Sequence, residues 1–195
     1  MPRAKPSQSR AKRQVLFVQG GGPDVHDRWD NKLVDSLKKE LGPNYEVRYP
    51  RMPDEADPHY AIWKPVLEAE LQTLDEGAIV VGHSIGAAML VNVLAERAMG
   101  FKLGGIFLIS APFVGEGGWS SDELNSPRDL GARLPQDVPV HIYHGLEDEE
   151  APPNHASLYE RAIPRAKVHR VAGRDHQFNN DLRGVAEQIK SVDRH

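Results

Sequence analysis

The sequence predicts an α/β protein in which a mostly parallel sheet of about six strands lies between two layers of helices, a three-layer α/β/α sandwich. Short runs of consecutive apolar and β-branched residues recur along the chain, as expected for strands that are buried on both faces. Segments with the apolar spacing of helices separate these runs. The length of 195 residues suits one domain with a sizeable core.

The first part of the chain alternates strand and helix signals. QVLFVQG (14–20) is a short apolar run that leads into glycines and a proline, which indicates a strand and a turn. Residues 27–41 are expected to form a helix with one buried stripe, because apolar residues recur there at four-residue steps. The stripe consists of Trp29, Leu33, Leu37 and Leu41. Trp29 starts it and is therefore expected in the core. YEVRYPRM (45–52) alternates like a strand.

The rest of the chain continues the alternation. The helical pattern at 58–74 includes Pro65, which predicts a kink or a break. AIVVGHS (78–84) is the next strand candidate, and it runs directly into a helix at 84–99. Three strand candidates and two helical stretches follow. The strands cover residues 104–112, 139–145 and 166–173, and the helices cover about 155–163 and 180–191.

Composition excludes several classes of protein. Residues 1–13 hold five basic residues and no acid, so we expect a disordered basic tail ahead of one domain at 14–195. Without that tail the chain has 19 basic and 28 acidic residues, which argues against a nucleic-acid surface. The absence of cysteine excludes disulfides, thiolate metal sites and cysteine nucleophiles. Because there is neither a secretory signal nor a long apolar run, we expect a cytoplasmic protein with no membrane contact.

Functional residues are expected in the loops that follow the strands. Right-handed crossovers place these loops at one edge of a parallel sheet, where ligands of open α/β sheets bind. The loop GHSIG has the G-x-S-x-G form of a nucleophile elbow, a strained strand-to-helix turn that exposes a serine at a helix N-terminus. Side chains two positions from Ser84 would collide in such a turn, which explains Gly82 and Gly86. Ser84 is therefore the candidate nucleophile.

A serine nucleophile requires a base and a group that orients the base, and in this kind of fold both come from later loops, first Asp or Glu and then His. His176 alone among the nine histidines lies both beyond the acidic loop and just after a strand, so we expect it to be the base. His83 adjoins Ser84, but its side chain should point away, and His144 should be structural. The acidic loop offers four candidates, Glu147, Asp148, Glu149 and Glu150.

The segments GHSIGA, HGLEDEEAP and GRDHQF resemble the three catalytic segments of the α/β-hydrolase superfamily. YPRMPDEADPHYAIWKPVLEAEL, followed by VVGHSIGA, more narrowly resembles the small serine hydrolases related to retinoblastoma-binding protein 9. The resemblance covers roughly residues 14–190. It implies a minimal hydrolase fold with a short cap, and it implies that the catalytic aspartate lies three residues beyond the glycine that ends its strand. Asp148 matches that position after Gly145, with Glu147 as the alternative.

The oxyanion-hole donors are expected from the same geometry. One is the backbone N–H of Ile85, and the other comes from the loop QGGGPD, where Gly21 and Gly22 are the candidates. Many relatives carry a His-Gly pair where this chain has Gln19-Gly20, so the donating amide stays open. A nucleotide site is excluded, because the G-x-G-x-x-G pattern would need glycine where Val25 stands. No metal-ligand pattern is present, and we expect no metal and no cofactor.

The predicted function is hydrolysis of small esters through a Ser-His-Asp triad and an acyl-enzyme, by a carboxylesterase-like enzyme. Thioester and amide hydrolysis use the same groups and stay open. The segment between Pro112 and Pro139 is too short for a large lid, so an open pocket for a small-molecule ester is expected. Its candidate lining residues are Phe113, Val114, Trp119 and Trp63, the last of which also suits the core. The alternative is a hydrolase-fold binding protein with weak turnover, although no protein partner is indicated.

Overall fold

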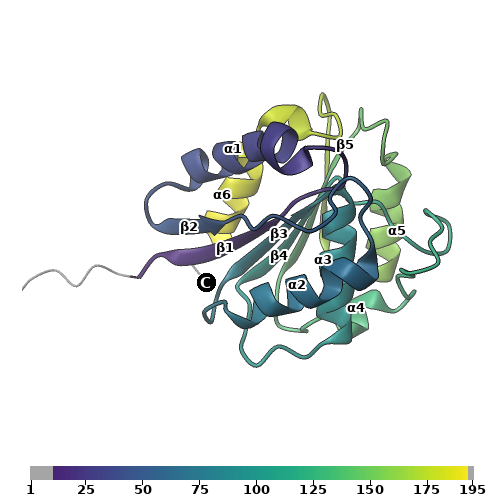
Figure 1. Cartoon of the computed structure of the whole chain (residues 1–195), viewed down its shortest axis with the longest axis horizontal. Coiled ribbons are helices and arrows are strands. Elements are labelled where there is room, and N and C mark those ends of the chain that lie inside the picture. The colour runs from purple at the N-terminus through teal and green to yellow at the C-terminus, as the bar shows by residue number, and fades with distance from the viewer. Residues whose placement is uncertain (1–10, 193–195) are drawn as a thin grey trace, which may run out of the picture.

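The computed structural model describes residues 11–192. Six strands form one sheet in the order β2-β1-β3-β4-β5-β6, and every neighbouring pair is parallel (Figure 1). The strands are β1 (Arg13–Val18), β2 (Tyr45–Arg48), β3 (Ile79–His83), β4 (Gly105–Ile109), β5 (Val140–Gly145) and β6 (Lys167–Val171). The prediction of a parallel sheet of about six strands is confirmed.

Helices cover both faces of this sheet, which completes the predicted three layers (Figure 1). They are α1 (Asn31–Leu41), α2 (Tyr60–Gln72), α3 (Ser84–Glu96), α4 (Leu130–Arg133), α5 (Asn154–Ala162) and α6 (Arg183–Val192). A π-helical turn, η1 (Val25–Asp30), precedes α1, and a short 3-10 turn, η2 (Phe178–Asn180), precedes α6. None of the helices in the described part of the chain is long and apolar enough to cross a bilayer.

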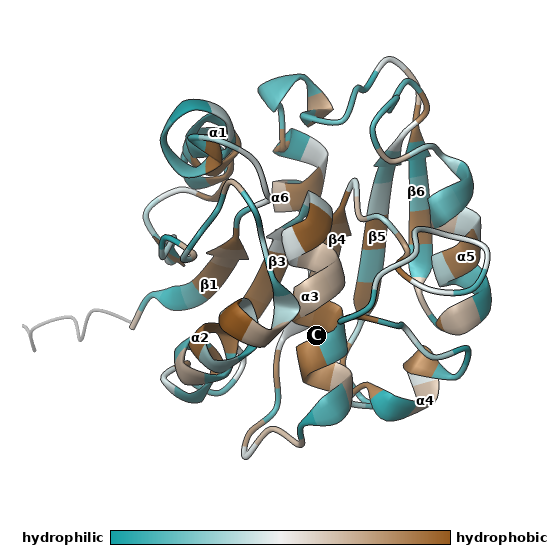
Figure 2. Ribbon diagram, turned by 45° about the vertical axis from the view of Figure 1, so that its right-hand side comes forward, coloured by the Kyte–Doolittle hydropathy of each residue, from teal (hydrophilic) through white to brown (hydrophobic). Residues whose placement is uncertain are grey.

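The core has two halves, one on each face of the sheet. Successive strand residues point to opposite faces, so Val15 and Phe17 of β1 join the half under α1 and α6, whereas Leu16 and Val18 join the half under α2 and α3. Every residue of β3, β4 and β5 is buried, while β6 at the edge is partly exposed. Figure 2 shows β3 and β4 as mostly hydrophobic ribbons in the middle of the molecule.

The order in which strands are added to the sheet reverses at β1, because β2 lies on one side of it and β3 on the other. Val18 of β1 is in register with Gly82 of β3. The residues that follow both strands therefore emerge side by side, at the switch point where open α/β sheets bind ligands. This register brings the glycine loop at 20–22 next to Ser84.

The structure corrects two expectations about the first helix. Residues 25–30 form the π-helical turn η1, and regular α-helix begins only at Asn31. The wider turn shifts the register, so Trp29 leaves the stripe that Leu33 continues, and this residue is 53% exposed. Asp30 is buried in its place. The expectation that Trp29 lies in the core is wrong.

Two further boundaries differ from the predicted ones. α2 runs through Pro65 without a break. Pro65 has no N–H to donate to the carbonyl of Ala61, but both residues are exposed, so water can hydrogen-bond to that carbonyl. Arg13, predicted to belong to the tail, is the first residue of β1, and its Nε donates to the carbonyl of Gly77 at 2.7 Å. Residues 1–10 of the predicted tail lie outside the described residues.

Candidate active site

Ser84 has the backbone conformation that the elbow motif predicts. Its φ of 51° lies in the left-handed region, which is strained for a residue with a side chain. A Cβ atom on Gly82 would lie 2.5 Å from the Cα of Ala87, and one on Gly86 would lie 1.8 Å from the carbonyl oxygen of Gln19. Only glycine fits these two positions, so the turn is as tight as the sequence indicates.

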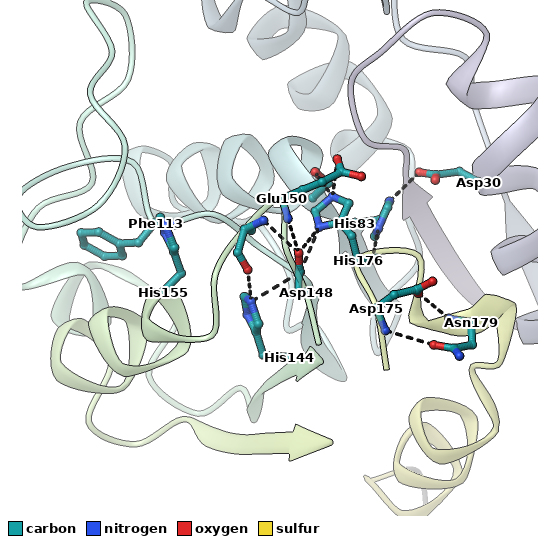
Figure 3. A network of polar contacts seen from close by, with 12 residues as sticks. Asp30, His83, Phe113, His144, Asp148, Glu150, His155, Asp175, His176 and Asn179 are labelled. Carbon is teal, nitrogen blue, oxygen red and sulfur yellow. Dashed lines mark hydrogen bonds and ion pairs between the residues drawn. The ribbon is translucent and has the colours of Figure 1, made fainter. Parts of the chain in front are cut away.

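The three predicted side chains meet at the end of the sheet. The Nε2 atom of His176 lies 2.8 Å from the Oγ atom of Ser84. The Nδ1 atom of His176 lies 2.9 and 3.0 Å from the carboxylate oxygens of Asp148 (Figure 3). Asp148 follows β5 and His176 follows β6. When the proton of the neutral imidazole is on Nδ1, it is donated to the carboxylate. Nε2 then has a lone pair that can accept the proton of the serine hydroxyl.

The Asp148 carboxylate is held in its ionised form. Burial acts to raise its pKa, but the hydrogen bond and the charge of His176 and the backbone N–H of Ala151 outweigh burial, so the pKa lies below its usual value. The N–H groups of Glu150 and Ala151 donate to Oδ1 at 3.0 and 2.9 Å. A fixed carboxylate at this point can stabilise positive charge on the imidazole.

His144 contacts the loop that carries Asp148. Its Nε2 donates to the carbonyl of Ala151 at 2.7 Å and lies 3.5 Å from Oδ2 of Asp148. Burial is the largest cause of its lowered pKa, which favours the neutral ring. These contacts agree with the expectation that His144 is a structural residue, because its ring binds a backbone carbonyl of the loop.

The other acidic residues of this region make no hydrogen bond to the imidazole of His176. Glu147, the alternative to Asp148, accepts the N–H of Gly173 at 3.0 Å. Asp175 is exposed and accepts the N–H of Asn179 at 2.8 Å (Figure 3). Glu150 approaches Nε2 of His176 to 3.7 Å, but its side chain is 74% exposed. Among the four acidic residues at 147–150, Asp148 alone is buried and hydrogen-bonded to the imidazole.

Two of the three amides of the glycine loop donate to acceptors in the protein. The N–H of Gly20 donates to Oδ2 of Asp30 at 2.7 Å, and that of Gly22 donates to the carbonyl of Glu55 at 2.6 Å. Among the residues that the structure describes, the N–H of Gly21 has no such partner. Gly21 packs against Ile85, since a Cβ added to it would lie 2.9 Å from Cγ2 of Ile85. Of the two glycine candidates, Gly21 fits an oxyanion donor, and Gly22 does not because its N–H is engaged.

Gln19 holds the glycine loop in place through its side chain, a role that the sequence did not predict. Its side chain is buried. Oε1 accepts the N–H of Met52 at 3.0 Å, and Nε2 donates to the carboxylate of Glu55 at 2.7 Å. Glu55 also accepts the N–H of His26 at 3.2 Å. The segment after β2 thus holds the glycine loop in place through contacts that no local motif encodes.

A cavity of about 610 Å³ opens beside Ser84 and His176. One wall is the glycine loop with Val25 and the exposed ring of Trp29. Four acidic residues, Glu147, Glu149, Glu150 and Asp175, also line it. The cavity therefore combines an apolar and aromatic part with several negative charges.

The predicted pocket residues lie elsewhere. Trp63 is fully buried in the core, where its Nε1 donates to the carbonyl of Pro53 at 2.7 Å. Phe113 is also buried, with its ring edge-on to Tyr159 at 5.1 Å. Neither lines the cavity beside Ser84. Val114 and Trp119 line a second cavity of about 310 Å³, which Ile85 also borders. The cap therefore encloses space next to the elbow, but not the space in front of the serine.

The parallel sheet, the elbow and the convergence of Ser84, His176 and Asp148 define an α/β-hydrolase. The chain belongs to the serine hydrolase family, whose model matches residues 16–176. It is 24% identical over 182 residues to the serine hydrolase RBBP9 of Rattus norvegicus, an alignment that covers 91% of this chain and 94% of the relative. The family resemblance seen in the sequence is confirmed.

Solved structures share the same architecture. The ydeN gene product of B. subtilis superposes with a TM-score of 0.75 at 19% identity, over 94% of this chain and all of that one (100%). The monoacylglycerol lipase of Paleococcus ferrophilus superposes with a TM-score of 0.67 at 14% identity, over 93% and 96% of the two chains. At these identities the likeness establishes the fold.

Proposed function

We propose that this chain hydrolyses small carboxylic esters, with Ser84 as nucleophile, His176 as general base and acid, and Asp148 as the carboxylate that orients the imidazole. The observation that carries the proposal is the unbroken chain of hydrogen bonds from Asp148 through His176 to Ser84, at 2.9 and 2.8 Å. The ionised state of Asp148 supports it, because a carboxylate stabilises the imidazolium that forms during reaction.

In the first half of the reaction Oγ of Ser84 attacks the ester carbonyl while Nε2 of His176 takes its proton. The oxyanion of the tetrahedral intermediate accepts hydrogen bonds from the N–H groups of Ile85 and Gly21. The C–O bond to the alcohol then breaks, and the imidazolium returns its proton to the departing oxygen. In the second half His176 deprotonates a water molecule, whose oxygen attacks the acyl carbon. The bond between that carbon and Oγ of Ser84 then breaks, and the imidazolium returns its proton to Oγ.

The size of the cavity favours small substrates. About 610 Å³ is a typical volume for a small-molecule pocket. The same groups would also cleave thioesters or amides, so acyl-chain length and leaving group are the variables to profile.

The direct test is covalent labelling of Ser84 by a fluorophosphonate, read as a mass increase of the intact protein. We expect labelling of the wild type and none of Ser84→Ala. Turnover of p-nitrophenyl acetate and butyrate should likewise vanish in Ser84→Ala. Full labelling of the variant would exclude Ser84 as nucleophile. Turnover of the wild type no higher than that of the variant would favour a hydrolase-fold binding protein.

A further inference from the structure

A second histidine–carboxylate pair lies behind the proposed triad. Asp30, at the end of η1, and His83, which precedes Ser84, are both almost fully buried. The Nδ1 atom of His83 lies 2.9 Å from Oδ2 of Asp30 (Figure 3). Neither residue takes part in the proton transfers described above.

Both ring nitrogens of His83 face acceptors that carry no hydrogen. Nδ1 faces the Asp30 carboxylate, and Nε2 lies 3.0 Å from the backbone carbonyl oxygen of His176. A neutral imidazole can donate from only one of its nitrogens, so the other would present a lone pair to an oxygen lone pair. Two donated bonds require the imidazolium form of His83.

The electrostatics agree with this assignment. Burial acts to lower the pKa of His83, but the charge and hydrogen bond of Asp30 outweigh it and the pKa is raised. Burial acts in the opposite sense on Asp30, and His83 together with Gly20 and Gln177 still holds its pKa below the usual value. The titratable groups that face His83 are Asp30, Asp148 and His176, one from each neighbouring segment.

The pair connects the three segments that build the site. Asp30 accepts the N–H of Gly20 at 2.7 Å with Oδ2, and the side-chain amide of Gln177 at 2.8 Å with Oδ1. His83 is the last residue of β3 and adjoins Ser84. Its bond to the carbonyl of His176 reaches the segment that carries the base. The glycine loop, the elbow and the histidine loop are thus joined through two buried side chains.

We propose that Asp30 and His83 form a permanently charged pair that positions His176 and the glycine loop relative to Ser84. A buried ion pair adds little net stability compared with apolar packing of the same volume, because both ions lose their hydration. The pair instead fixes the relative positions of the glycine loop, the elbow and the histidine loop, through four hydrogen bonds of 2.7–3.0 Å. The proposed reaction requires these three segments to be correctly placed. Both are positioning residues, and the kinetic part of this inference rests on the proposed function.

The charge of His83 is tested without any substrate. Nitrogen-15 NMR of the imidazole groups, recorded at about pH 8, above the ordinary imidazole pKa, should show two protonated ring nitrogens for His83. The signals are assigned by their loss in His83→Gln. A single protonated nitrogen would overturn the assignment of a charged pair.

The positioning role is tested with Asp30→Asn, which keeps the shape of the side chain and removes the charge. We expect kcat to fall about 10- to 100-fold with KM nearly unchanged, because a displacement of about 1 Å at a reacting group costs that much in rate. The matched control is His141→Asn, which alters an equally buried histidine in β5, packed against Phe107 and His169. The control should keep its kcat at a comparable loss of melting temperature.

An unchanged kcat in Asp30→Asn, or an equal fall in His141→Asn, would overturn the positioning role. Should Asp30→Asn fail to fold, His83→Gln, which keeps one donor toward the carbonyl of His176, is measured in the same way. If the wild type does not react with a fluorophosphonate, the proposed function fails and the positioning role with it. The NMR spectrum would still decide the charge of His83.

Discussion

The Nε2 atom of His176 lies 2.8 Å from the Oγ atom of Ser84, across 92 positions of sequence and two intervening strands of the sheet. The loop after β6 has to pass over the end of β5 to reach the elbow after β3. It does so at Gly145, where a Cβ atom would lie only 2.1 Å from the carbonyl oxygen of Arg174. This glycine ends β5 for a spatial reason: it leaves room for the segment that carries His176.

Replacing Gly145 by alanine should therefore push the histidine loop away from Ser84. We expect Gly145→Ala to lower the free energy of unfolding by about 1–3 kcal/mol, as overpacking does, and to lower kcat together with it. The control is Gly184→Ala, since nothing lies within 4 Å of a Cβ added there. Urea denaturation and ester turnover of both variants measure the effect. Equal behaviour of the two would contradict the close approach.

Asp148 and Glu147 are adjacent in sequence but not equivalent in space. Asp148→Asn should lower kcat about 10⁴-fold, because the amide favours the wrong imidazole tautomer. Glu147→Gln should change kcat less than about twofold, since its carboxylate contacts the backbone of Gly173 and not His176. Steady-state kinetics on p-nitrophenyl butyrate compare the two variants. A larger loss in Glu147→Gln would reverse the assignment.

The pH dependence of the proposed reaction follows from the lowered pKa of Asp148. This carboxylate stays ionised near neutral pH, so its own protonation does not limit the rate there. We expect log kcat/KM to rise with pH with a slope of one and then to level off, because only the neutral imidazole accepts the serine proton. A profile that is flat through the range in which an imidazole titrates would remove His176 from the role of base.

The sequence was informative where a local pattern carries the geometry. Gly82 and Gly86 around Ser84 are a local steric requirement, so the elbow could be predicted, and the alternation of strands and helices placed the loops of Asp148 and His176 at one edge. Periodicity failed at Trp29, because a π-helical turn changes the residue spacing without leaving a sequence signature.

Long-range contacts account for what could not be predicted. The engagement of the Gly22 N–H depends on a carbonyl at position 55, and the pairing of Asp30 with His83 joins residues 53 positions apart. The absence of the four predicted pocket residues from the cavity beside Ser84 has a similar reason. The sequence suggested the cap residue Phe113, which points into the core, whereas the acidic loop itself borders the cavity.

That cavity should select substrates by charge. Four acidic residues, Glu147, Glu149, Glu150 and Asp175, line it, and negative charge around a cavity attracts cationic substrates. Esters with a cationic group on the alcohol should have a higher kcat/KM than isosteric anionic esters. The ratio should shrink as salt is added, because exposed charges are screened. A preference for the anionic ester, or a ratio that does not depend on salt, would contradict this selection.

Buried neutral histidines should make the fold sensitive to acid. His141 is buried between Phe107 and His169, and burial lowers its pKa to about 4. The unfolded chain binds a proton at this residue near pH 6.5, whereas the folded chain does so only near 4. Between these values the unfolded state holds more protons, so the free energy of unfolding falls as pH falls, by up to roughly 3 kcal/mol from this residue.

Urea denaturation at several pH values between about 4 and 7.5 tests this assignment, since that range spans the ordinary imidazole pKa. In His141→Asn the acid-side loss of stability should be smaller than in the wild type. His59 is the matched contrast, because its exposed imidazole is hydrogen-bonded to Glu123 and its pKa is raised. The stability that His59 contributes is present below its unfolded pKa and is lost as pH rises, so His59→Gln should leave the acid-side loss intact. If the two variants lose stability in acid to the same extent, His141 is not the group that titrates.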